Sequence, residues 1–173
     1  MVDLKSQYQN IKPEVDAALQ EVVDSCQFIN GPAVQSFSKN LADYLSAKHV
    51  IPCANGTDAL QIALMALGLQ PGDEVITAPF TFVATAEVIA LLQLKPVFVD
   101  VNPCTFTLNE YQIEAVITDR TKAIIPVHLF GQGANMHAIM RLAANHDLAV
   151  VEDNAQAIGA DYIFPDGKQQ KLG

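Results

Sequence analysis

The sequence predicts an α/β fold, with a mostly parallel sheet between two layers of helices. From residue 49 onward, short apolar runs alternate with longer segments of helical periodicity, which is typical of parallel strands joined by helices. Right-handed crossovers between such strands place helices on both faces of the sheet. Of the 173 residues, 50% are hydrophobic and 17% are charged, which is sufficient for one domain with a sizeable core. We therefore expect a three-layer α/β/α arrangement.

Residues 1–48 precede this alternation and are expected to form a helical segment of their own. Pro13 can open a helix at its first position, and apolar residues follow at helical spacing as far as Val22. This spacing predicts that one face of the helix is buried. Asn30-Gly31-Pro32 then forms a turn, and the helical pattern resumes as far as Leu45.

Residues 49–173 are expected to hold the α/β domain. The predicted strands are residues 49–53, 74–77, 97–100, 123–127 and 149–151. Helices are predicted between them, after Asn55-Gly56, over residues 84–92, after Asn109 and after Asn135. Asparagine side chains commonly cap the first turn of a helix, so Asn109 and Asn135 mark two of these helix starts.

Charge and composition exclude several classes of function. The net charge is −9 and the basic residues form no stripe, which argues against nucleic acid or an anionic membrane surface as the main partner. No stretch approaches the roughly 20 apolar residues needed to span a bilayer, and the start lacks an apolar signal core, so we expect a cytoplasmic protein. The three cysteines form no Cys-x-x-Cys pair, so neither a disulfide framework nor a metal site is predicted.

The stretch Glu152-Asp153-Asn154-Ala155-Gln156 follows the last predicted strand and is the first candidate for a reaction site. In open α/β sheets, ligands bind at the carboxyl ends of the strands, where these residues emerge. Asp153 can hold a carboxylate against a protonated ring nitrogen, and Gln156 can hydrogen-bond a neighbouring ring oxygen. This is how a protein tunes pyridoxal phosphate (PLP), whose charged ring takes up electrons. From these residues alone, Asp153 could equally cap a turn after a strand.

The second candidate is Asn55-Gly56-Thr57-Asp58, a glycine turn between an apolar run and a helix. Unpaired N–H groups at the helix N-terminus suit a phosphate, Gly56 allows close approach of the backbone, and the Thr57 hydroxyl can donate to a phosphate oxygen. Asp58 has an alternative role, because a carboxylate in the first turn of a helix is favourable without any ligand. Both Gly-x-Gly-x-x-Gly and the P-loop motif are absent, so a dinucleotide oxidoreductase is the weaker alternative.

Two further side chains follow predicted strands. Phe82 could lie flat on a planar cofactor and hold it against the Asp153 side of the site, although an aromatic residue beside a helix start more often belongs to the core. His128 could contact cofactor or substrate, although a histidine that is only hydrogen-bonded beside the site explains it equally well. The local sequence leaves both questions open.

Taken in order, these stretches resemble the DegT/StrS family of PLP-dependent sugar aminotransferases, which have the aspartate aminotransferase fold (fold type I). The resemblance covers nearly the whole chain and rests on an ordered set of motifs: Asp3-Leu4, Asn30-Gly31-Pro32, Asn55 to Leu60, Pro71 to Ile76, Thr81 to Thr85, Thr121 to His128 and Glu152 to Gln156. It implies the following cofactor-binding roles: Gly56, Thr57 and Asp58 at the phosphate, Phe82 on the ring, Asp153 at the ring nitrogen and Gln156 beside the phenolic oxygen.

The resemblance implies transfer of an amino group from a glutamate-type donor to a nucleotide-linked keto-sugar, by a homodimer whose subunits share their active sites. In the family, the lysine that forms a Schiff base with PLP lies in a downstream motif, and Lys168 and Lys171 match no such motif. We therefore expect that lysine to lie beyond Gly173 and the C-terminal small domain to be absent. Residues 49–173 are then an incomplete PLP-binding large domain, inactive by itself.

Two alternatives share much of this pattern. A sugar dehydratase of the same family, dependent on PLP or pyridoxamine phosphate (PMP), would carry a histidine in place of the lysine. A non-catalytic remnant or oligomerisation module would keep the first half of the fold without turnover. The presence of Asp153 and Gln156 argues against a remnant, because a module without a cofactor has no physical need for them.

Overall fold

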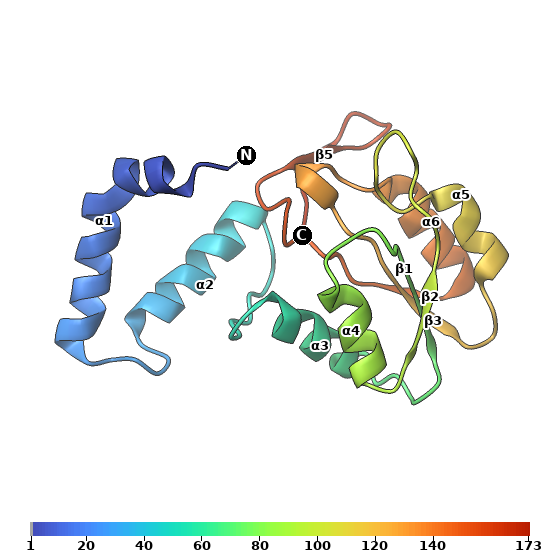
Figure 1. The fold of residues 1–173 in the computed structure, drawn as a ribbon, viewed down its shortest axis with the longest axis horizontal. Helices are drawn as coiled ribbons and strands as arrows, with labels where there is room; N and C mark the ends of the chain where they lie inside the picture. Colours follow the sequence, from blue (N-terminus) through green and yellow to red (C-terminus); the bar gives the residue numbers. More distant parts are fainter. Residues whose placement is uncertain (1) are drawn as a thin grey trace. The chain divides into compact units, whose positions relative to one another are not determined.

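The computed structural model describes residues 2–173, which form two compact units (Figure 1). The first unit ends at Pro52, and the second runs from Cys53 to Gly173. The first unit is helical, whereas the second contains all the strands found in residues 2–173. Within the same described residues, no helix is both long and apolar enough to cross a bilayer.

Helix α1, Leu4–Ser25, is the first element of the first unit. The expected start of this helix at Pro13 is wrong, because the Asp3 side chain already caps the chain, with its Oδ1 accepting from the Ser6 N–H at 3.0 Å. Pro13 lies inside the helix, where it removes one backbone donor without ending the helix.

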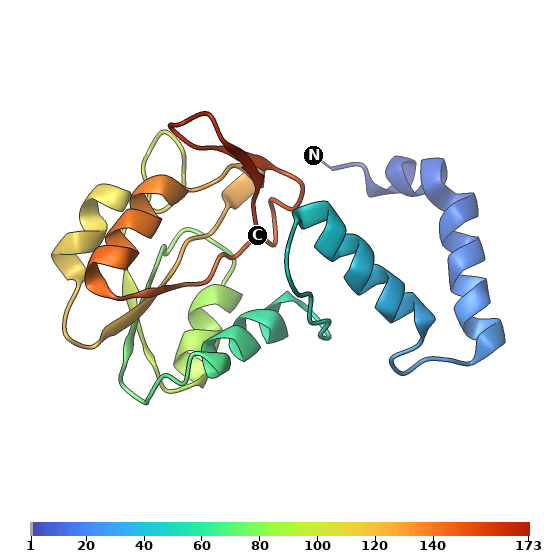
Figure 2. The ribbon, with the colours of Figure 1, turned by 180° about the vertical axis from the view of Figure 1, so that it is seen from behind.

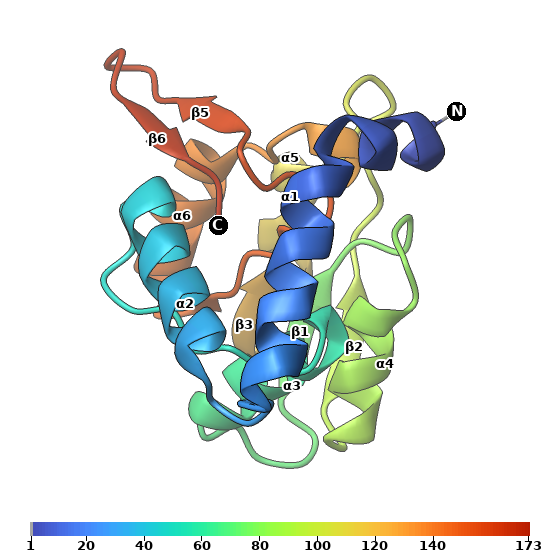
Figure 3. The same ribbon diagram turned by 90° about the vertical axis from the view of Figure 1, so that its left-hand side faces the viewer.

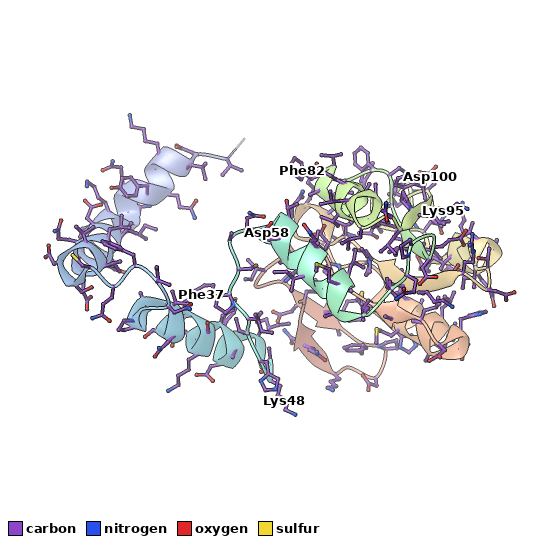
Figure 4. The ribbon with its side chains drawn as sticks, turned by 90° about the horizontal axis from the view of Figure 1, so that it is seen from below. Phe37, Lys48, Asp58, Phe82, Lys95 and Asp100 are labelled. Atoms are coloured by element: carbon purple, nitrogen blue, oxygen red, sulfur yellow. The ribbon has the colours of Figure 1, made fainter. Side chains whose placement is uncertain are left out.

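Helix α2, Pro32–Leu45, follows the expected turn, in which Asn30 has a left-handed backbone with φ of 50°. Neither α1 nor α2 contains a buried residue, so the expectation of a buried face on the first helix is wrong. Two helices supply too few neighbours to enclose a side chain. Apolar side chains such as Phe37 therefore remain exposed, as Figure 4 shows for that residue.

A parallel sheet with the strand order β2-β1-β3-β4 forms the centre of the second unit. Its strands are β1, Glu74–Thr77; β2, Lys95–Phe98; β3, Thr121–Ile125; and β4, Ala149–Val150. In this register, Ile76 of β1 lies opposite Val97 on one side and Ile124 on the other. The parallel pairing confirms the predicted fold class.

The first predicted strand, residues 49–53, is not a strand. Most of its residues are exposed, and no strand of the described chain pairs with it. Pro52 also lacks an N–H group for a ladder hydrogen bond. An apolar run forms a strand only where a neighbouring strand can pair with it, and this run has none.

Helices cover both faces of the sheet (Figures 1 and 2). The helical elements are α3, Gly56–Ala66; α4, Ala84–Leu91; α5, Glu110–Ile113; α6, Met136–His146; and the 3₁₀ turns η1, Glu114–Val116, and η2, Leu129–Gly131. Ile89 of α4 shares one buried cluster with Ile125, whereas Ile139 of α6 shares a second with Ile124. Successive residues of β3 thus face opposite helical layers, which confirms the three-layer arrangement.

An antiparallel hairpin follows β4 and consists of β5, Asp161–Ile163, and β6, Gln169–Lys171 (Figure 3). The Tyr162 hydroxyl accepts from the His137 N–H at 3.0 Å and donates to Asn135 Oδ1 at 3.2 Å. Asn135 also caps α6, as predicted, by accepting from the Ala138 N–H at 3.3 Å. These contacts tie the hairpin to the first turn of α6.

Candidate functional site

A cavity of about 220 Å³ lies at the carboxyl edge of the sheet in the second unit. Its lining residues come from the start of α3, the loop before α4, the end of β3 and the segment after β4: Gly56, Thr57, Leu60, Thr81, Phe82, Ala84, Val127, Asp153, Ala155 and Gln156. All the predicted cofactor-binding residues except Asp58 are therefore brought together around one cavity.

The backbone at Asp153 continues the pairing of the parallel sheet. Its N–H donates to the Pro126 carbonyl at 2.9 Å, and its carbonyl accepts from the His128 N–H at 3.1 Å. Only 8% of the residue is exposed. The carboxylate accepts from the Thr85 hydroxyl at 2.7 Å through Oδ2 and from the Ala155 N–H at 3.3 Å through Oδ1. The sheet and these two donors hold a buried carboxylate at the cavity wall.

Thr85 is a site residue that reasoning from the sequence missed. It is fully buried on the inner face of α4, together with Val88 and Ile89. A threonine on the apolar face of a helix is the signal that could have identified it, because a buried hydroxyl needs a hydrogen-bond partner. Its partner is Asp153, 68 positions away in the sequence.

The Gln156 carboxamide is oriented by the backbone of Phe130. Its Oε1 accepts from the Phe130 N–H at 3.0 Å. Phe130 has a left-handed backbone with φ of 57°, which is uncommon for a bulky residue and is often found at functional sites. The contact leaves Gln156 Nε2 as the unpaired end, since it has no acceptor among residues 2–173. The side chain is thus a hydrogen-bond donor at the edge of the cavity.

The start of α3 supplies backbone donors to the same cavity. Asn55 Oδ1 accepts from the Asp58 N–H at 2.9 Å, whereas the N–H groups of Gly56 and Thr57 have no acceptor within the described chain. A Cβ atom at Gly56 would meet nothing within 4 Å, so the space in front of this turn is open. Unpaired N–H groups at the positive end of a helix suit an anion.

Asp58 lies outside the lining of the cavity. Its carboxylate accepts from Asn55 Nδ2 at 3.2 Å, so the two side chains cap the first turn of α3. Figure 4 shows Asp58 on this turn and Phe82 on the loop that precedes α4. This contact is the alternative role that the sequence offered for Asp58.

Phe82 lies at the rim of the cavity with 70% of its surface exposed, so it does not belong to the core. His128 is fully buried and does not line the cavity. Its Nδ1 accepts from the Ala134 N–H at 3.1 Å, so Nε2 is the donor in the 2.8 Å contact to Glu152 Oε2. His128 is thus a buried histidine that is hydrogen-bonded beside the site, which is one of the two explanations that the sequence left open.

The two lysines near the C-terminus are directed elsewhere. Lys171 pairs with Asp161 at 2.8 Å and donates to the Gly159 carbonyl at 3.1 Å, on the β5–β6 hairpin. Neither Lys168 nor any other lysine of residues 2–173 lines the cavity. The described cavity therefore offers a carboxylate, an amide donor, helix N–H groups and an aromatic ring, but no amine.

These groups match the chemical features of PLP. A phosphate fits the unpaired N–H groups and the open space at Gly56, and a protonated ring nitrogen fits the buried carboxylate of Asp153. The unpaired donor of Gln156 fits a ring oxygen, and the exposed ring of Phe82 fits a flat aromatic surface. The residues present thus fit the cofactor that the sequence predicted.

Comparison with known proteins points the same way. A sequence profile described as the DegT/DnrJ/EryC1/StrS aminotransferase family matches residues 9–170. The chain is 54% identical over 162 residues to a pleiotropic regulatory protein of Geobacillus stearothermophilus, covering 94% of this chain and 44% of that protein. It is also 54% identical over 161 residues to the UDP-2-acetamido-2-deoxy-3-oxo-D-glucuronate aminotransferase of Pseudomonas aeruginosa, covering 93% and 45%.

Solved structures show the same fold. DesV of S. venezuelae has a TM-score of 0.93 and 40% identity, covering 99% of this chain and 45% of that one. The E. coli GDP-4-keto-6-deoxy-D-mannose-3-dehydratase with bound hydrated PLP has a TM-score of 0.78 and 28% identity, covering 83% and 38%. The chain thus spans less than half the length of these relatives.

Proposed function

The chain belongs to the DegT/DnrJ/EryC1/StrS aminotransferase family, and from this premise we propose that it forms the PLP-binding part of a sugar aminotransferase. The proposed reaction converts a nucleotide-linked keto-sugar into an amino-sugar, with a glutamate-type amino acid as donor. The observation that carries the proposal is the single cavity in which a buried carboxylate, an unpaired amide donor and an unpaired helix N-terminus meet.

PLP, when bound, supplies an electron-withdrawing ring that carries an amino group from a donor to an acceptor. The proposal assigns the phosphate to the N–H groups of Gly56 and Thr57 and to the Thr57 hydroxyl. Asp153 holds a proton at the ring nitrogen, because a buried carboxylate favours a cationic partner. Gln156 donates to the ring oxygen, and Phe82 covers one face of the ring and excludes water from it. Asp58 supports the phosphate site indirectly, by capping α3.

The substrate class is supported by the named sugar aminotransferase of P. aeruginosa, with 54% identity. The proposed location is the cytoplasm, which is supported by three free and exposed cysteines, since thiols stay reduced there. A homodimer is proposed because large apolar side chains, among them Leu19, Phe28 and Phe37, are exposed on the isolated chain.

The dehydratase remains a second candidate, supported by the likeness to the E. coli enzyme. A cavity without a lysine is compatible with both reactions, because the Schiff-base lysine of the proposed aminotransferase would have to come from outside residues 2–173. A non-catalytic module is a third candidate, supported by the regulatory name of the G. stearothermophilus relative.

Borohydride reduction of the protein purified from its native cells separates these candidates. Borohydride traps a lysine–PLP linkage covalently, so the aminotransferase proposal predicts an intact mass that includes a reduced-cofactor adduct. Peptide mapping should place that adduct on neither Lys168 nor Lys171. In protein first incubated with a keto acid, which converts the PMP of an aminotransferase to PLP, cofactor that is released on denaturation without an adduct would favour the dehydratase, and absence of any cofactor would favour the non-catalytic module.

A further inference from the structure

We propose that Thr85 is a positioning residue that fixes the rotation of the Asp153 carboxylate toward the cavity. The part of this inference that concerns Asp153 and a cofactor rests on the proposed function. The part that concerns the two side chains rests on geometry alone. Thr85 does not line the cavity, so it acts through Asp153 and does not touch a ligand.

The contact between the two side chains is short and fully enclosed. The Thr85 hydroxyl lies 2.7 Å from Asp153 Oδ2, with Thr85 fully buried and Asp153 8% exposed. The other donor, the Ala155 N–H, lies 3.3 Å from Oδ1, beyond the usual range for such a bond. Thr85 is therefore the stronger of the two donors that hold the carboxylate.

The hydroxyl of Thr85 is directed away from its own helix. Thr85 is the second residue of α4, so no helical turn precedes it, and its hydroxyl donates to a side chain from a different element. The terminal torsion of an aspartate has a broad energy profile, so an aspartate without such a partner adopts a range of rotations. A buried donor on α4 selects one rotation and leaves the remaining lone pairs of the carboxylate for a ligand.

Three substitutions in the 173-residue chain test this inference. Thr85→Val keeps the shape of the side chain and removes the hydroxyl, whereas Thr85→Ser keeps the hydroxyl. Thr77→Val is the matched control, because Thr77 is also fully buried and its hydroxyl donates to the Ile125 carbonyl at 2.9 Å, away from the cavity lining. Thr77→Val thus removes a buried hydroxyl without touching Asp153.

The first measurement is the crystal structure of each ligand-free variant. We expect one rotation of the Asp153 carboxylate in the wild type, Thr85→Ser and Thr77→Val, and a changed or divided rotation in Thr85→Val. A carboxylate that keeps its wild-type rotation in Thr85→Val overturns the inference. This measurement does not depend on whether the chain binds PLP.

The second measurement is the dissociation constant for PLP, from the fluorescence of the cofactor, with the absorption spectrum of the complex recorded alongside. We expect Thr85→Val to raise the constant about tenfold and to shift the spectrum, since a hydrogen bond to a charged group is lost. Thr85→Ser should restore both values, and Thr77→Val should leave both near wild type while lowering the melting temperature. Equal effects of Thr85→Val and Thr77→Val would overturn the inference. A wild-type chain that binds no PLP would overturn the proposed cofactor, and the crystal structures would still decide the role of Thr85.

Discussion

At the scale of single residues, Gln156 shows how the chain makes a directed donor from an exposed, flexible side chain. The Phe130 N–H donates to Oε1 at 3.0 Å and so orients the amide group, whose Nε2 is the end without a partner among residues 2–173. Phe130, which supplies that N–H, has a left-handed backbone. The proposed role of Gln156 therefore depends on whether the unpaired end of its side chain, Nε2, can donate a hydrogen bond.

Gln156→Glu tests this dependence, because it keeps an acceptor for the Phe130 N–H but replaces the donor with a second carboxylate oxygen. We expect the dissociation constant for PLP to rise by at least about tenfold, since a donor to the ring oxygen becomes a like-charged neighbour. Gln112→Glu is the control for added charge, because Gln112 lies on α5 and does not line the cavity. An equal rise in both variants, or no rise in Gln156→Glu, would contradict the proposed role.

Local sequence was sufficient to name Asp153, Gln156 and Gly56 as candidates, because each stands next to a strand end or a helix start, and all three line the cavity. It was not sufficient to find Thr85 or Phe130. The Thr85 contact joins two elements 68 positions apart. The conformation of Phe130 has no signature in residue type, since a glycine or asparagine would have been expected at a positive φ.

At the scale of elements, Glu74 links β1, β2 and the segment before β3 at the amino end of the sheet. This carboxylate on β1 accepts from Lys95 of β2 at 2.8 Å and from the Thr118 hydroxyl at 2.6 Å, just before β3. Its side chain is only 6% exposed. The hydrogen bond from Lys95 and then that from Thr118 lower the pKa of Glu74 below its ordinary value, against desolvation, which raises it.

A lowered pKa in the folded state makes stability depend on pH in a defined direction. The contribution of the Glu74 carboxylate to the free energy of unfolding is fully present above the pKa of a glutamate in the unfolded chain. It is lost as the pH falls through the lower pKa that Glu74 has in the folded chain. Urea unfolding from pH 7 to pH 3 should therefore show a falling free energy of unfolding. Glu74→Gln should be less stable at pH 7 and show a flatter fall. Parallel curves for the two proteins would contradict this account.

The element boundaries show which parts of the fold depended on tertiary contacts. The helices after Asn109 and Asn135 begin where their caps predicted, because a cap is a local interaction. The second observed strand begins at Lys95, two residues before its predicted start, because its register is set by pairing with Glu74 on β1. Strand ends depend on the neighbouring strand, which the local pattern does not contain.

At the scale of the whole molecule, the buried apolar residues of the described chain all belong to the second unit. They extend from Leu60 to Leu172, whereas α1 and α2 contribute none. Most helical stability in proteins comes from packing an apolar face. The stability of the isolated chain should therefore come from the second unit.

Ile124→Ala and Phe37→Ala in the full chain test that distribution. Ile124 is fully buried and Phe37 is 56% exposed, so we expect Ile124→Ala to cost about 2 to 5 kcal/mol of the free energy of unfolding and Phe37→Ala less than about 0.5 kcal/mol. Urea unfolding followed by circular dichroism measures both. Similar costs would mean that the first unit also contributes to the core. A cost for Phe37→Ala that grows with protein concentration would instead mean that a second copy of the chain covers this side chain, because association stabilises by mass action.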